Sequence, residues 1–141
     1  MSWLLDTDVL CQPVKTNGNR AVVSWLEREQ AECYTSTVVL AQVAYWIRTK
    51  EGRARTRLQA WLTQSIEAME GRILSFNVGT AHVWADQKFL LEQAGQRMPV
   101  EDSYIAATAR RHGLTIVTGN DRDFQRPGLK VFNPFKELPQ A

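Results

Sequence analysis

Short apolar runs alternate with helical segments along the chain, and this alternation limits the folds that it can adopt. Strands are predicted at residues 2–6, 33–36, 72–76, 114–118 and 130–132. Between them, apolar side chains recur at helical spacing over residues 19–29, 38–49, 54–70, 80–94 and 100–112. Helices between successive strands provide the crossovers that a parallel sheet needs. The pattern predicts an α/β domain with a short, mostly parallel sheet, and it argues against an antiparallel all-β fold.

The composition fits a single domain spanning residues 1–141. Hydrophobic residues make up 44% of the chain and charged residues 23%, as in globular proteins. No apolar run approaches the roughly 18 residues of a membrane span, and no signal-type segment begins the chain. We therefore expect a cytoplasmic protein without a membrane anchor. Cys11 and Cys33 lack zinc-site spacing and are expected to be reduced and partly buried.

The first strand carries two carboxylates in the stretch Trp-Leu-Leu-Asp-Thr-Asp-Val-Leu, which begins at Trp3. Burying a carboxylate without a partner is costly, so Asp6 at the strand end needs an explanation. Ligand sites of parallel α/β sheets lie beyond the carboxyl ends of the strands, which makes Asp6 a candidate functional residue. Asp8 is expected to be the N-cap of a short helix that begins at Val9.

Further oxygen-bearing side chains are expected at the same edge of the sheet: Asp102, Asn120, Asp121 and Asp123. Taken singly, each acid has a simpler role, as a partner of the helix dipole or as a turn residue. Taken together, clustered carboxylates repel one another and raise their own pKa values. A divalent cation relieves that repulsion, and oxygen ligands without His or Cys favour Mg²⁺ or Mn²⁺ over zinc. Such a site suits hydrolysis of a phosphodiester.

Five segments give the chain a resemblance to PIN-domain ribonucleases, particularly toxins of the VapC and FitB type. In order, they read LLDTD, TSTVVLAQ, MPVEDSYIAATARRHG, TGNDRDF and VFNPF, and their order and spacing match over essentially the whole chain. The resemblance implies a three-layer α/β/α fold and an endoribonuclease that depends on Mg²⁺ or Mn²⁺. It also implies a homodimer, a small inhibitory antitoxin, and an RNA substrate such as tRNA.

The resemblance also implies roles for individual residues. Asp6 and Asp102 would be the main metal ligands, and Asp123 would complete the acidic cluster. Asn120 would contact Asp6 or the metal, and Thr7 occupies a position where the family has a small hydroxyl residue.

Gln42 departs from the family pattern, which usually has Glu at this position. Its carbonyl oxygen can accept a hydrogen bond, but it carries no charge and cannot act as a base. One interpretation is an attenuated ribonuclease in which a second metal is weakened. The alternative is a catalytically impaired protein that binds RNA or a partner. Trp46, four residues further on, stands where the family often has Gly; with Tyr45 it could line a groove for an antitoxin or for a second copy of the chain.

Basic residues provide candidates for contacts with RNA. Arg97, Arg122 and Arg126 flank the acidic residues in sequence and are the stronger candidates for substrate phosphate. A second cluster is formed by Arg48, Lys50, Arg53, Arg55 and Arg57. This second cluster fits an RNA contact, an antitoxin surface or an ordinary solvated helix.

One unrelated activity is compatible with the first motif. Aspartyl-phosphate phosphatases also carry Asp-x-Asp after an apolar strand, the first Asp acting as nucleophile. Leu10 stands where those enzymes usually have Thr or Val, and a suitably placed lysine is hard to find. The phosphatase is therefore a minor alternative.

Overall fold

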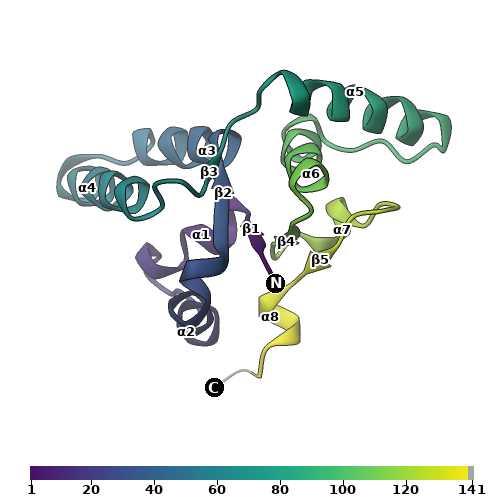
Figure 1. The fold of residues 1–141 in the computed structure, drawn as a ribbon. Helices are drawn as coiled ribbons and strands as arrows, with labels where there is room; N and C mark the ends of the chain where they lie inside the picture. Colours follow the sequence, from purple (N-terminus) through teal and green to yellow (C-terminus); the bar gives the residue numbers. More distant parts are fainter. Residues whose placement is uncertain (140–141) are drawn as a thin grey trace.

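The computed structural model describes residues 1–139 and arranges the chain around a five-stranded sheet (Figure 1). The strands are β1 (Trp3–Leu5), β2 (Cys33–Ser36), β3 (Ile73–Leu74), β4 (Thr115–Val117) and β5 (Val131–Phe132). Their order is β3-β2-β1-β4-β5, and every neighbouring pair is parallel. The predicted α/β fold with a short parallel sheet is confirmed. The strand order reverses direction around β1, which therefore lies at the centre of the sheet.

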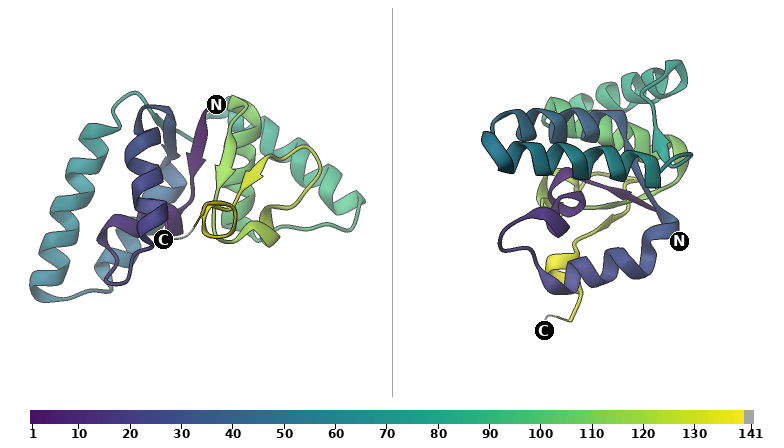
Figure 2. Two further views of the ribbon diagram at one scale, coloured as in Figure 1. Left: turned by 90° about the horizontal axis from the view of Figure 1, so that it is seen from below. Right: turned by 90° about the vertical axis from the view of Figure 1, so that its left-hand side faces the viewer.

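Helices cover both faces of this sheet. The longer ones are α2 (Arg20–Glu29), α3 (Thr37–Arg48), α4 (Gly52–Ala68), α5 (Val78–Gln93) and α6 (Val100–His112). Short helices are α1 (Thr7–Leu10), α7 (Asp121–Phe124) and α8 (Pro134–Glu137), with 3-10 turns η1 (Gln12–Val14) and η2 (Gln30–Glu32). Helices α3 to α6 lie on one side of the sheet, and α2 and α8 lie on the other (Figures 1 and 2). The three-layer α/β/α arrangement is therefore present.

Local sequence explains where several of these helices begin. Asn19, Ser36 and Asn77 are N-caps whose side-chain oxygens accept backbone N–H groups in the first turn of α2, α3 and α5. Helix α6 ends at Gly113, which has a φ of 66°. This left-handed conformation favours glycine and allows the chain to turn directly into β4.

An aromatic cluster joins the sheet to α2. The rings of Trp3 and Trp25 are 5.1 Å apart between centroids, and Phe132 lies 5.3 Å from Trp3 and 5.5 Å from Trp25. Trp25 is 95% removed from solvent, its exposed fraction being 5%. The cluster connects β1, α2 and β5, so it anchors the helix layer opposite α3 and α6.

Three details differ from the sequence predictions. Asp8 does not cap a helix at Val9, because α1 already begins at Thr7 and its N-cap is Asp6. Helix α7 lies between the strands predicted at 114–118 and 130–132, where no helix was predicted. Helix α8 was not predicted either, and it begins at the Asn133–Pro134 step directly after β5. Asn133 caps α8 by accepting the N–H of Phe135 at 3.0 Å, with Pro134 in the first turn, a position that proline favours.

Cys11 and Cys33 are free thiols, as predicted, and both are buried. Burial raises the pKa of Cys11 to about 11 and that of Cys33 to about 12. Both thiols therefore stay protonated near neutral pH, which makes them poor nucleophiles. No helix within residues 1–139 has the length and apolarity to cross a membrane.

Candidate active site

Asp6 lies at the carboxyl end of the central strand, where the strand order reverses. In parallel α/β sheets this position opens a crevice in which ligands bind. The Asp6 carboxylate accepts the N–H of Thr7 at 2.8 Å and the hydroxyl of Thr118 at 2.8 Å. Its backbone N–H donates to the carbonyl of Val117, the last residue of β4, at 3.0 Å. Asp6 is therefore fixed by groups from the start of α1 and from the end of β4.

Asp102 brings a second carboxylate to this edge from the first turn of α6. Burial, followed by the negative charges of nearby acids, raises the pKa of Asp102 to about 6. These acids are Asp6, Asp123, Glu101 and Asp8. Burial also raises the pKa of Asp6, although its hydrogen bonds with Thr118 and Thr7 oppose that shift. The site therefore concentrates negative charge that the surrounding protein does not neutralise.

Asp8 has a different environment from Asp6. One carboxylate oxygen accepts the N–H of Gly119 at 2.8 Å, and the other is buried without a hydrogen-bond partner among residues 1–139. Burial and the nearby charge of Asp6 raise the Asp8 pKa to about 6. A Cβ on Gly119 would come within 2.6 Å of Asp8 and 2.9 Å of the Phe135 ring. Asp8 thus holds the loop after β4 against α1, and the close approach requires glycine at position 119.

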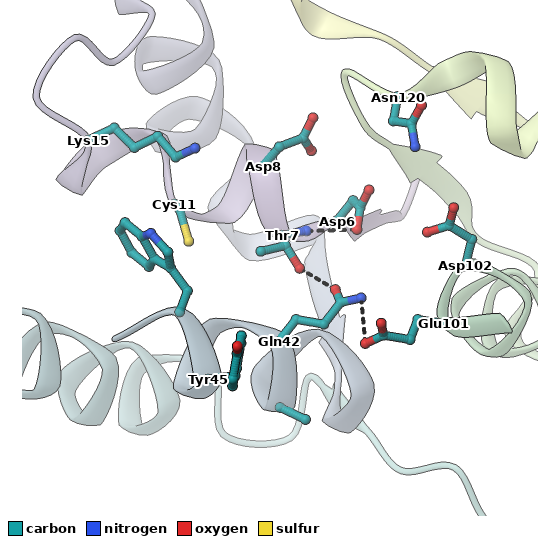
Figure 3. Close-up of a pocket in the computed structure, with 12 residues that line it drawn as sticks. Asp6, Thr7, Asp8, Cys11, Lys15, Gln42, Tyr45, Glu101, Asp102 and Asn120 are labelled. Atoms are coloured by element: carbon teal, nitrogen blue, oxygen red, sulfur yellow. Dashed lines mark hydrogen bonds between the residues drawn. The ribbon is translucent and has the colours of Figure 1, made fainter. Parts of the chain in front are cut away.

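These residues open into a cavity of about 560 Å³ (Figure 3). Its lining is Asp6, Thr7, Asp8, Cys11, Lys15, Ala41, Gln42, Tyr45, Trp46, Glu101, Asp102 and Asn120. Figure 3 shows the Asp102 carboxylate directed toward Asp6 from the opposite wall. The structure therefore brings together the predicted residues Asp6, Thr7, Gln42, Asp102 and Asn120.

Gln42 lies in α3 and bridges two walls of the cavity. Its carbonyl oxygen accepts the hydroxyl of Thr7 at 2.5 Å, and its amide nitrogen donates to Glu101 at 3.3 Å. Glu101 is a cavity residue that the sequence analysis did not single out, although it immediately precedes Asp102. The amide thus holds a carboxylate close to the position where the family usually has its own glutamate.

Asp123 and the predicted arginines lie outside the cavity lining. Asp123 accepts the side-chain amide of Asn120 at 2.8 Å, so it reaches the site through Asn120 and through its charge. Arg126 donates to the carbonyls of Gln96 at 3.0 Å and Arg97 at 2.7 Å. These bonds tie the loop after α7 to the loop before α6, which gives Arg126 a structural role.

The donor set fits a hard divalent cation. No three His, Cys, Asp or Glu side chains within residues 1–139 are grouped closely enough to enclose a metal ion. Mg²⁺, however, is commonly held by only one or two carboxylates, with water and substrate phosphate in its other positions. Asp6 and Asp102 provide such a pair of oxygen donors, and a cation between them would offset the repulsion that raises the Asp102 pKa.

Comparison with known proteins accounts for this arrangement. The PIN domain family pattern matches residues 3–129. The chain belongs to the PIN-domain family. Toxin FitB of Neisseria gonorrhoeae is 33% identical over 137 residues, covering 95% of this chain and 99% of the relative. VapC ribonuclease Y4jK of Sinorhizobium fredii is 30% identical over 136 residues, covering 94% of this chain and 97% of the relative.

A solved structure extends the likeness to three dimensions. The crystal structure of FitAcB from Neisseria gonorrhoeae matches this PIN domain with a TM-score of 0.89 and 31% sequence identity. The match covers 95% of this chain and 99% of the other. The predicted resemblance is therefore confirmed along the chain, and it favours phosphodiester chemistry over the aspartyl-phosphate alternative.

Proposed function

We propose that this PIN domain is an endoribonuclease that depends on Mg²⁺ or Mn²⁺ and is the toxin of a bacterial type II toxin–antitoxin pair. The observation that carries the proposal is the Asp6 and Asp102 pair in a cavity at the point where strand order reverses. Likeness to proteins named as a toxin and as a ribonuclease supports it. The proposed substrate is a structured RNA such as tRNA, and the proposed location is the cytoplasm.

The residues at the acidic end of the cavity have proposed parts in the chemistry. Asp6 and Asp102 would hold the cation, which when bound would supply positive charge and an activated water for attack on the phosphodiester. The hydrogen bonds to Thr7 and Thr118 keep the Asp6 carboxylate in one orientation. Asn120 would contact a substrate oxygen from the rim while its amide stays bonded to Asp123. Pre-set orientation of this kind lowers the cost of reaching the reactive geometry.

Gln42 supports a second candidate function, a PIN domain that binds RNA or a partner without efficient cleavage. Its amide cannot accept a proton from water, and its carbonyl oxygen is already bonded to Thr7. Glu101 restores a negative charge in the neighbourhood, but it is exposed and comes from α6 rather than α3. Of the two candidates, we propose the enzyme, with its activity reduced because Gln42 stands where the family usually has Glu.

RNA cleavage separates the two candidates. The purified chain would be incubated with tRNA and with Mg²⁺, Mn²⁺ or EDTA, beside the variants Gln42→Glu and Asp6→Asn. We expect cleavage by the original chain, faster cleavage by Gln42→Glu, strongly reduced cleavage by Asp6→Asn, and none in EDTA. Gln64→Glu, which adds the same charge at an exposed position of α4, is the matched control. Cleavage by Gln42→Glu alone would identify the original chain as a binding protein.

Two partners follow from the same proposal. A small antitoxin would bind the toxin and block its activity, as the likeness to a named toxin suggests. Homodimer formation is supported by exposed apolar side chains of α5 and α6, including Phe89 at 63%, Leu90 at 64% and Val100 at 61% exposure. Light scattering on Phe89→Glu tests the dimer, because a buried charge at this position would give a monomer.

A further inference from the structure

The two ends of the cavity differ in chemistry. Asp6, Asp102 and Glu101 make one end acidic, whereas Tyr45, Trp46 and Lys15 line the other. Figure 3 shows Lys15 and Tyr45 on the left, and Glu101 and Asp102 on the right, with Gln42 between them. The acidic end accounts for metal-dependent chemistry and leaves the aromatic and basic end without a role.

Helix periodicity places the aromatic side chains beside the catalytic end. Tyr45 and Trp46 follow Gln42 by three and four residues in α3, and residues at these spacings share a helix face. Three or four residues make about one helical turn, so a ligand that contacts Tyr45 or Trp46 lies about one turn away from Gln42. The two ends can therefore contact neighbouring parts of one extended ligand.

Tyr45 and Trp46 differ in how they are held. Trp46 is half-buried and packs against the hydrophobic core, which fixes its position. Tyr45 is 72% exposed, although an aromatic ring of this size usually buries much of its surface. A fixed tryptophan beside an exposed tyrosine at the mouth of a cavity leaves an aromatic surface on which a planar ligand can stack.

Lysines bring positive charge to the same end. The ammonium of Lys50 lies 5.3 Å from the centroid of the Trp46 ring, and that of Lys15 lies 6.0 Å from it. Cation–π contacts hold both charges near the aromatic residues. Proteins that bind single-stranded nucleic acid combine the same two elements, rings that stack on bases and cations that contact phosphates.

We propose that Tyr45, Trp46, Lys15 and Lys50 form a nucleotide subsite for single-stranded RNA, next to the bond that is cut. A base stacks on Tyr45, and the two lysines contact its phosphates. The neighbouring phosphate then lies beside the cation that Asp6 and Asp102 would hold. This subsite rests on the proposed ribonuclease function and would take an unpaired nucleotide of the RNA, such as one in a loop of a structured RNA. The cavity volume of about 560 Å³ lies within the range of roughly 300–1,000 Å³ typical of ligand sites.

Binding without cleavage provides the first test. The probe is a six-nucleotide RNA with 2-aminopurine at its centre, titrated with protein in EDTA, where stacking changes the probe's fluorescence. Tyr45→Ala is expected to weaken binding about tenfold, as loss of one base–aromatic stack does. Tyr45→Phe keeps the ring and is expected to bind like the original chain. Equal affinity for Tyr45→Ala and Tyr45→Phe would overturn the subsite.

The salt dependence of affinity tests the lysines separately. Affinity for single-stranded RNA falls as salt rises, and each lost phosphate contact makes the plot of log affinity against log salt less steep by about 0.7. We expect this decrease for Lys15→Gln and for Lys50→Gln, and no decrease for Lys130→Gln, an exposed lysine outside the cavity lining. Identical slopes for all these proteins would count against phosphate contacts at Lys15 and Lys50.

The same variants distinguish failure of the subsite from failure of the proposed function. If the original chain cleaves tRNA and Tyr45→Ala does so with an unchanged KM, the ribonuclease proposal stands and the subsite proposal is wrong. Probe binding that depends on Tyr45 without any RNA cleavage would retain the subsite and remove the ribonuclease. If Tyr45→Ala changes the oligomeric state or antitoxin binding and leaves probe affinity intact, the exposed ring belongs to a protein interface, and the proposal is wrong.

Discussion

The aromatic cluster beneath the sheet and the acidic end of the cavity lie at β1 but have opposite energetics. Trp3, Trp25 and Phe132 attract one another and bury apolar area together. Burial raises the pKa of both Asp6 and Asp102, and the charge of Asp6 raises that of Asp102 further. The hydrogen bonds of Asp6 with Thr118 and Thr7 oppose the shift at Asp6. The same strand thus supports one region that stabilises the fold and another, the proposed cation site, that reduces its stability. Stability and activity should therefore be separable by substitution.

The largest effect on stability is expected at Trp25. Trp25→Ala removes the centre of the aromatic cluster and should lower the free energy of unfolding by about 3–5 kcal/mol. Urea denaturation measures the loss, with Glu27→Ala at an exposed position of α2 as the control. A change below about 1 kcal/mol would show that the cluster is not a main source of stability.

Asp6→Asn should have the opposite effect, a loss of activity with little change in folding stability. Asparagine is also a good N-cap, so its side-chain oxygen can still accept the N–H of Thr7 and keep α1 in place. We expect RNA cleavage to fall by about 100-fold or more, equivalent to about 2.7 kcal/mol in the activation free energy. The free energy of unfolding in EDTA should stay within about 1 kcal/mol of the original value. Loss of folding together with activity would contradict the separation.

Metal affinity should depend on pH in a defined window. The Asp102 pKa is about 6, so below pH 6 a cation has to displace a proton from this carboxyl group. Calorimetric titration with Mn²⁺ should show affinity rising by up to about tenfold per pH unit below pH 6 and levelling off above it. Asp102→Asn removes the proton and should flatten the profile. A profile that is flat in the original chain would contradict competition at Asp102.

The smallest expected effect is a gain in folding stability when Asp102 is replaced by Asn in the absence of metal. Between the usual Asp value of 3.8 and about 6, folded Asp102 keeps a proton that the unfolded chain has lost. Folding stability from this group therefore falls as pH rises through that window. In EDTA at pH 7, Asp102→Asn should raise Tm by about 2 °C, and the gain should disappear near pH 4. Asp86→Asn, at an exposed position of α5, should leave Tm unchanged.

The sequence was most informative where local pattern decides structure. Strand β2 and helix α6 begin and end where apolar spacing and Gly113 predict. The position of Asp6 at the carboxyl end of the first strand was predicted correctly, and the rule that ligand sites follow the carboxyl ends of parallel strands made it a candidate. The helix start at Thr7 was missed because the N-cap depends on the backbone angles of Asp6, φ −77° and ψ 166°, which spacing alone does not reveal.

Long-range side-chain contacts were the least predictable part of the site. Gln42 and Glu101 are 59 positions apart and meet only because α3 and α6 pack side by side. The bonds from Arg126 to backbone carbonyls likewise depend on how two loops approach each other. In both cases residue type indicated polarity correctly, but the partner depended on tertiary packing.

The bond between Gln42 and Glu101 has an evolutionary consequence. A glutamate at position 42 would face the carboxylate of Glu101 where an amide now donates a hydrogen bond. The effect of changing one position therefore depends on the residue at the other, so the two sites are expected to show epistasis. A lineage that acquired glutamate at position 42 would gain most after Glu101 had first changed to a neutral residue.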